Sequence, residues 1–135
     1  MPEMHRVLLV EDNDENQNYA RIVLEKAGLT VDIAWNGAEA IRLLAERDYA
    51  VVLMDCIMPV MTGVEATERI RDGSANARNP NIPIIGITAN AYQSNCNACM
   101  LAGMSDWITK PVSAEALREI VLKWAYSAVG EPLAA

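Results

Sequence analysis

The chain has 135 residues, the length of one domain, because two hydrophobic cores would each be marginal at this size. Hydrophobic residues make up 52% of the sequence, so a substantial core is expected rather than disorder. Eighteen acidic residues against eleven basic ones give a net charge of −7, which disfavours binding to nucleic acids and to anionic lipid surfaces.

The first apolar run predicts a buried parallel strand. Residues 7–10 read VLLV, a continuous run rather than an alternating one, as in strands that helices cover on both faces. The next residues predict a helix over 15–27, with Asp14 as its cap and Gly28 as its left-handed stop. Apolar residues at spacings of three and four predict the inner face of this helix: Ala20, Val23, Leu24 and Ala27.

The rest of the chain repeats this alternation of strand and helix. We expect strands over 30–34, 50–54, 83–87 and 105–108, and helices over 38–47, 64–71, 91–102 and 114–126. The expected inner face of the helix over 38–47 is Ala40, Ile41, Leu44 and Ala45. Strict alternation implies parallel pairing through right-handed crossovers. We therefore predict an α/β fold, a flavodoxin-like doubly wound (βα)5 domain with strand order 2-1-3-4-5. The domain would span 5–126, between a lead at 1–4 and a tail at 127–135.

Polar side chains stand at the predicted carboxyl ends of four strands. Glu11 and Asp12 follow the first strand, Asp55 the third, Thr88 the fourth and Lys110 the fifth. In a doubly wound sheet, sites form at this edge, near the switch point between strands 1 and 3. Three clustered carboxylates repel one another unless a cation neutralises them, and oxygen ligands select a hard ion such as Mg²⁺. A carboxylate nucleophile, a metal ion and cationic or hydroxyl donors are also the parts that phosphoryl transfer needs.

At these positions the sequence resembles the receiver domains of two-component response regulators. The matching segments are VEDN at 10–13, MDCIMPVMTG at 54–63, ITANA at 87–91 and TKP at 109–111. The resemblance extends from about His5 to Tyr126, and it is closest to receivers of hybrid sensor kinases and to some free-standing receivers. It implies a chain that accepts a phosphoryl group and then regulates a partner.

The resemblance also implies a role for each acidic residue of the site. Asp55 would be the phosphoacceptor. Asp12, Asp55 and the backbone carbonyl of Ile57 would bind Mg²⁺, and Glu11 would hold a water molecule bound to the metal. The expected cofactor is therefore Mg²⁺ alone.

Two further residues, Thr88 and Lys110, would contact the phosphoryl group. In the switch that the resemblance implies, an aromatic ring three residues before the lysine turns inward as Thr88 is drawn to the phosphate. The family usually has Tyr, Phe or His there, whereas this chain has Trp107. Trp107 either serves as this switch residue or simply fills space beside the fourth helix.

The partners implied by the resemblance are proteins. A histidine kinase or histidine phosphotransfer protein would donate the phosphoryl group and dock near the first helix, where Asn16, Gln17 and Tyr19 are candidate contacts. A downstream protein would bind the fourth helix, fifth strand and fifth helix, over about 91–126. We expect no nucleic acid partner and no direct membrane contact. The sequence has no basic, apolar N-terminal signal and no membrane-length apolar stretch, so we expect a cytoplasmic protein.

Two other classes of protein compete with this interpretation. A pseudo-receiver that docks partners without being phosphorylated would lack site residues, and none is missing here. A hydrolase with an aspartyl nucleophile would carry a second acid two residues after Asp55, where this chain has Ile57. The expected chemistry is limited to phosphorylation of the chain itself from a donor and slow autodephosphorylation. Such a chain is either a free-standing receiver or the receiver part of a hybrid histidine kinase.

Overall fold

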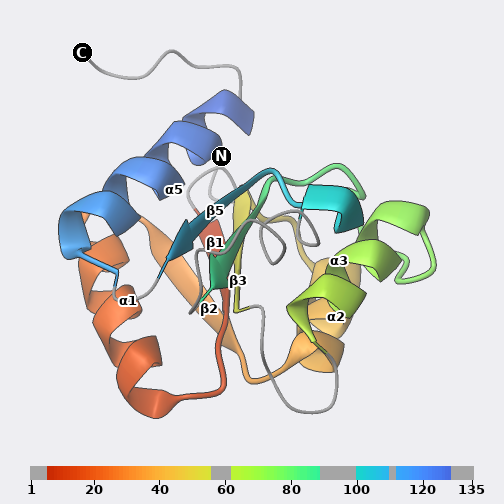
Figure 1. The fold of residues 1–135 in the computed structure, drawn as a ribbon, viewed down its shortest axis with the longest axis horizontal. Helices are drawn as coiled ribbons and strands as arrows, with labels where there is room; N and C mark the ends of the chain where they lie inside the picture. Colours follow the sequence, from red (N-terminus) through yellow and green to blue (C-terminus); the bar gives the residue numbers. More distant parts are fainter. Residues whose placement is uncertain (1–5, 56–61, 89–99, 110–111, 129–135) are drawn as a thin grey trace.

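The fold is a five-stranded parallel sheet with helices on both faces (Figure 1). The computed structural model describes residues 6–55, 62–88, 100–109 and 112–128. The strands are β1 (Arg6–Val10), β2 (Thr30–Ala34), β3 (Val51–Asp55), β4 (Ile84–Thr88) and β5 (Asp106–Thr109). The described helices are α1 (Asp14–Lys26), α2 (Gly37–Glu46), α3 (Gly63–Asp72) and α5 (Ala114–Ala128). Their sheet order, β2-β1-β3-β4-β5, confirms the predicted flavodoxin-like fold.

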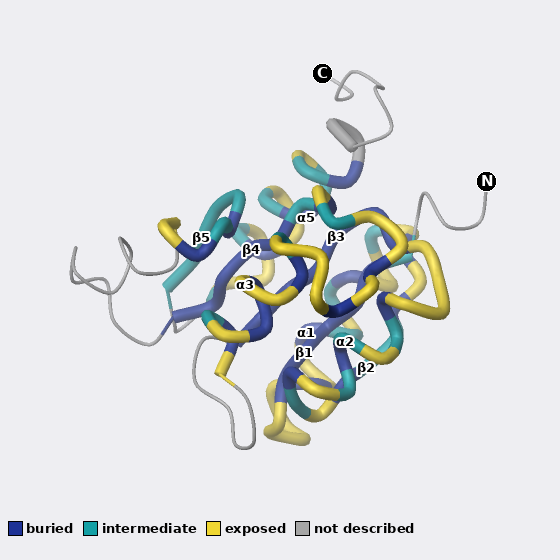
Figure 2. The backbone as a smooth tube through the Cα atoms, turned by 90° about the vertical axis from the view of Figure 1, so that its right-hand side faces the viewer, coloured by how far each residue is buried: buried dark blue, intermediate teal, exposed yellow. Residues whose placement is uncertain are grey.

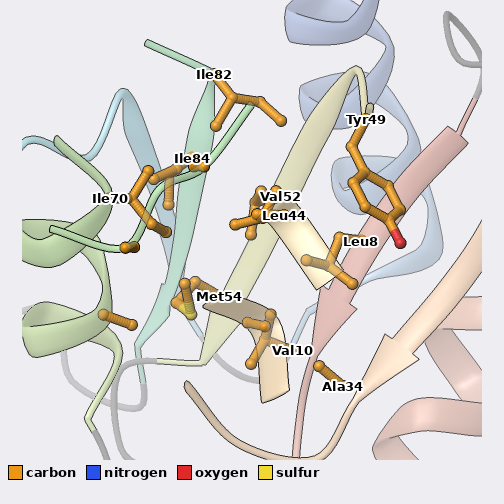
Figure 3. Close-up of a cluster of buried hydrophobic side chains, with 14 of the residues drawn as sticks. Leu8, Val10, Ala34, Leu44, Tyr49, Val52, Met54, Ile70, Ile82 and Ile84 are labelled. Carbon is orange, nitrogen blue, oxygen red and sulfur yellow. The ribbon is translucent and has the colours of Figure 1, made fainter. Parts of the chain in front are cut away.

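Two hydrophobic clusters hold the helices on the sheet. Helices α1 and α5 pack on one face, through one cluster that includes Leu24 and Val121, and α2 and α3 pack on the other (Figure 1). Every residue of β3 and β4 is buried, which explains why their apolar runs are continuous. Figure 2 shows β3 and β4 in the dark blue of buried residues, whereas β5 at the edge of the sheet is only half-buried. The cluster under α2 and α3 is drawn in Figure 3, where Leu44 and Ile70 face the sheet residues Val52 and Ile84.

The helix starts differ from the sequence-based predictions. Asn13, not Asp14, caps α1, because its side chain accepts a hydrogen bond from the backbone N–H of Asn16 at 2.9 Å. Asn36 caps α2 in the same way through the backbone N–H of Glu39, so this helix already begins at Gly37. The predicted stop after α1 is confirmed, since Gly28 has a φ of 90°.

Other helix predictions differ in smaller ways. Ala45 is exposed, so its predicted place on the inner face of α2 is wrong. The predicted helix over 91–102 lies largely outside the described residues, which include only its end, helical at 100–102. Within the described part of the chain, no helix is both long and apolar enough to cross a lipid bilayer.

A charged network ties β1 and β2 to the residues before β3. Asp32 accepts hydrogen bonds from Arg6 Nη1 at 3.1 and 3.2 Å and from Arg47 Nη1 at 3.2 Å. The hydroxyl of buried Tyr49 donates to the same carboxylate at 2.8 Å. A carboxylate on an edge strand is thus compensated by two cations and a hydroxyl, as a partly buried charge requires.

We expect Tyr49→Phe to lower the free energy of unfolding by about 1–2 kcal/mol, because it removes a hydrogen bond to a charged acceptor. Burial raises the pKa of the Tyr49 hydroxyl, and the bond to Asp32 raises it further. The protonated hydroxyl therefore stabilises the folded state fully below the ordinary tyrosine pKa of about 10, and this contribution is lost as pH rises through the higher folded-state pKa.

Urea unfolding of both proteins near neutral pH and above about pH 10 measures this difference. The stability advantage of the wild type over Tyr49→Phe should shrink in the alkaline series. An advantage that stays constant or grows with pH would show that the hydroxyl is not held in its protonated form by the fold.

Candidate functional site

Three of the polar residues predicted at strand ends lie at one edge of the sheet. Asp55 is the last residue of β3, Thr88 is the last residue of β4, and Glu11 follows β1 directly. The strand register aligns these ends, since Val10 pairs with Met54 and Asp55 pairs with Ile87. The three strands therefore deliver their polar side chains to the same place, next to the point where the strand order reverses.

Three carboxylates form the centre of this site. One oxygen each from Glu11, Asp12 and Asp55 can be chosen so that all lie within 4.8 Å of one another. Glu11 and Asp55 are only 3% and 4% exposed, whereas Asp12 faces solvent. Three carboxylate oxygens at the entrance of the site, two of them in low-dielectric surroundings, fit a hard divalent cation such as Mg²⁺. An ion held there would stay accessible to water on the side of Asp12.

The segment that carries Glu11 and Asp12 is fixed by several hydrogen bonds. The backbone N–H of Glu11 donates to the carbonyl of Ala34 in β2 at 3.0 Å. The Glu11 carbonyl accepts from Gln17 Nε2 at 2.6 Å, and its side-chain Oε2 accepts from the backbone N–H of Asn13 at 3.2 Å. The turn between β1 and α1 is therefore held on the side of the sheet and on the side of the helix.

Gln17 corrects one sequence-based expectation. It was a candidate contact for the phosphoryl donor, but it is only 7% exposed and lies on the inner face of α1 with Ala20 and Leu24. The sequence contained a signal for this burial, because residue 17 is three residues before Ala20 and seven before Leu24, which places all three on one helical face. The polar side chain of Gln17 nevertheless favoured an exposed position.

Of the other predicted site residues, two are described by the structure and two are not. Thr88 is buried and sits beside Thr109 in the β4–β5 register. Trp107 is half-buried on β5, opposite Gly86, and its two possible roles stay open. The positions of Ile57 and Lys110 lie outside the described residues.

A cavity of about 490 Å³ adjoins the acidic cluster between α1 and α5. The described residues that line it are largely apolar: Leu9, Glu11, Asn16, Tyr19, Ala20, Ile87, Val112 and Leu117. The Tyr19 hydroxyl donates to the Val112 carbonyl at 3.0 Å and so links α1 to the segment just before α5. Tyr19 is nevertheless 44% exposed, and its neighbour on the helix surface, Ile22, is 53% exposed.

The arrangement of sheet, acidic cluster and buried threonine can be compared with known proteins. A family model described as the response regulator receiver domain matches residues 7–122. The chain belongs to this receiver family. The match confirms the resemblance inferred from the four sequence segments and identifies the chain as a receiver domain of two-component signalling.

Several related receivers have high similarity over nearly the whole chain. Two-component system protein A of Emericella nidulans is 41% identical over 126 residues, covering 91% of this chain and 18% of that protein. The receiver domain of a sensor histidine kinase from Pseudomonas aeruginosa PAO1 is 37% identical with a TM-score of 0.81, covering 90% of this chain and 97% of that one. Its crystal structure has a magnesium ion coordinated in the active site cleft.

Another similar solved structure contains two proteins. It is a co-crystal structure of the Saccharomyces cerevisiae histidine phosphotransfer signalling protein Ypd1 with the receiver domain of its downstream response regulator Ssk1. The match has 32% identity and a TM-score of 0.82, and it covers 91% of this receiver and 90% of that chain. The present chain spans less than a fifth of the length of the curated relatives that it matches, several of which are histidine kinases.

Proposed function

We propose that this receiver accepts a phosphoryl group on Asp55 from a phosphohistidine, in a reaction that depends on Mg²⁺. The observation that carries the proposal is the cluster of Glu11, Asp12 and Asp55 within 4.8 Å at the carboxyl edge of the sheet. Three carboxylates this close repel one another, and a divalent cation bound between them would offset that repulsion. Asp55 is the member that projects from the central strand β3.

The transfer step follows from the chemistry of these groups. A carboxylate oxygen of Asp55 attacks the phosphorus, the bond between phosphorus and the donor's imidazole nitrogen breaks, and that nitrogen takes up a proton. Mg²⁺, when bound, supplies positive charge that offsets the charge on the phosphoryl oxygens. Asp12 and Asp55 would hold it with the Ile57 carbonyl, and Glu11 would act through a water molecule.

Two residues would sense the new phosphoryl group. Thr88 is buried at the end of β4, where its hydroxyl can donate to a phosphoryl oxygen on the neighbouring strand end. We propose that Thr88 and Lys110 move toward that group and bias an equilibrium between two conformations, with Trp107 as the ring that follows Thr88. The changed surface would be the region over about 91–126, where a downstream protein binds.

The donor would dock on the exposed side of α1. Tyr19 and Ile22 present apolar area there, 44% and 53% exposed, beside the mouth of the acidic site. A histidine kinase or histidine phosphotransfer protein is the donor we propose, and the complex of Ypd1 with the Ssk1 receiver is a precedent. The cytoplasmic location and the domain limits at 5 and 126 stay predictions.

Phosphorylation by a small-molecule donor tests the proposal directly. The protein is incubated with Mg²⁺ and acetyl phosphate or phosphoramidate, and its intact mass is recorded with and without excess chelator. We expect one added phosphoryl group that requires the metal. If a folded protein gains no mass from either donor, the alternative of an unphosphorylated docking module replaces this proposal.

A further inference from the structure

The peptide group between Glu11 and Asp12 occupies an unusual place in the sheet. The pairing of β1 with β2 and with β3 ends at Val10, and the Glu11 N–H adds one more bond, to the carbonyl of Ala34. The Glu11 carbonyl comes after that ladder and is buried with its residue. A buried carbonyl needs a donor, and among the described residues the side chain of Gln17 provides one.

Gln17 supplies that donor from inside the protein. Its side-chain Nε2 lies 2.6 Å from the Glu11 carbonyl oxygen, in a buried contact, and only 7% of the residue is exposed. Its own backbone N–H donates to the Asn13 carbonyl at 2.9 Å, so the glutamine is fixed in the first turns of α1. An amide nitrogen held this way sets the position of the carbonyl that it contacts.

We propose that Gln17 is a positioning residue for the metal site. Gln17 fixes the peptide plane that contains the carbonyl of Glu11 and the N–H of Asp12. The orientation of this peptide influences the direction of the Cα–Cβ bonds of Glu11 and Asp12, two of the three clustered acids. Gln17 contacts neither the ion nor the phosphoryl group, and it acts by reducing the freedom of the turn before the ion arrives. This inference rests on the proposed Mg²⁺-dependent function.

The size of the effect follows from comparable cases. Loss of an outer-shell partner typically costs about 10–100-fold in metal affinity. Gln17 holds the backbone rather than a ligand atom, so we expect a weaker effect, about five- to twentyfold. The maximal phosphorylation rate should change little, since Asp55 and the phosphoryl-contacting residues stay in place.

The test compares Gln17→Met with Tyr49→Phe. Methionine keeps the length of the glutamine side chain but cannot donate a hydrogen bond. Tyr49→Phe is the control, because it also removes one side-chain hydrogen bond, but at the start of β3, at the opposite end of this strand from Asp55. Calorimetric titration gives the dissociation constant for Mg²⁺, and phosphoramidate kinetics give the Mg²⁺ concentration for half-maximal rate. In Gln17→Met we expect both to rise about five- to twentyfold at a nearly unchanged maximal rate. Both should stay at the wild-type value in Tyr49→Phe.

Two results would overturn the inference. One is a Gln17→Met protein that is destabilised but binds Mg²⁺ as the wild type does, which is the behaviour of a purely structural residue. The other is measured by NMR on the wild-type protein, so it can be obtained even if the variant does not fold. We expect the Gln17 side-chain amide signals to shift during a Mg²⁺ titration with the same midpoint as metal binding. Signals that do not respond to Mg²⁺ would contradict the proposal.

Failure of the wider function looks different. If the wild-type protein neither binds Mg²⁺ nor accepts a phosphoryl group, the proposed function falls. If the wild type does both and Gln17→Met matches it, only the role of Gln17 falls.

Discussion

Asp55→Asn is expected to reduce phosphorylation by small-molecule donors at least about 1,000-fold, a change of roughly 4 kcal/mol in activation free energy. The amide oxygen of asparagine is a poor nucleophile. The substitution also removes one negative charge from the cluster with Glu11 and Asp12. Asp55 is the buried last residue of the central strand β3. Intact mass after incubation with phosphoramidate and Mg²⁺ gives the rate.

Asp48→Asn is the matched control. Asp48 is an exposed aspartate that pairs with Arg78 at 2.9 Å, near the start of β3 and away from its acidic end. The same chemical change there should leave phosphorylation unaltered. Equal labelling of Asp55→Asn and wild type would mean that the phosphoryl group is carried elsewhere in the chain, and peptide mapping would then locate it.

Arg71→Met is expected to lower the free energy of unfolding by about 2–4 kcal/mol, the largest stability effect that we anticipate outside the apolar core. The guanidinium joins three segments. Arg71 Nε donates to the Gly103 carbonyl at 2.8 Å, Nη1 to the Pro80 carbonyl at 2.7 Å, and Nη2 to Ser105 Oγ at 3.4 Å. Methionine keeps part of the apolar stem but removes the donor to the Gly103 and Pro80 carbonyls, whereas Ser105 Oγ still accepts from the backbone N–H of Ile84 at 3.2 Å.

The surroundings of Arg71 offer no simple replacement for the hydrogen bonds that its guanidinium makes. Burial lowers the pKa of its guanidinium, and among the described residues no carboxylate pairs with it, so the carbonyls supply the compensation. Gly103 has a φ of 110°, and a Cβ at that position would lie 2.7 Å from Arg71 Cγ. The arginine stem thus occupies space that only a glycine at 103 leaves open.

Arg69→Met provides the comparison within the same helix. Arg69 is exposed and also lies in the last turn of α3, and its side chain makes no hydrogen bond to any described residue like those of Arg71. Urea unfolding should show a change within about 0.5 kcal/mol for Arg69→Met. Similar losses in both variants would mean that α3 depends on positive charge near its C-terminus rather than on the bonds of Arg71.

The sequence determined the frame of the protein and most of its candidate site. Buried parallel strands need continuous apolar runs, so VLLV at 7–10 and the apolar residues before Asp55 could be read without coordinates. Once strands and helices alternate, chain connectivity restricts the sheet order, and the polar residues after each strand fall at one edge. The place of Asp12, Asp55 and Thr88 at this edge could be predicted on this basis, because it follows from local pattern and topology.

The tertiary structure decided what each polar residue touches. Asn13 rather than Asp14 caps α1, since the chain direction after β1 determines which of two suitable side chains reaches the free N–H groups. Gln17 donates a hydrogen bond to the Glu11 carbonyl, and Arg71 donates to the carbonyls of Pro80 and Gly103. These bonds join residues whose partners depend on where separate segments meet in space. Apolar periodicity records which face of an element is buried, but it carries no information on the donor that a particular buried carbonyl will find.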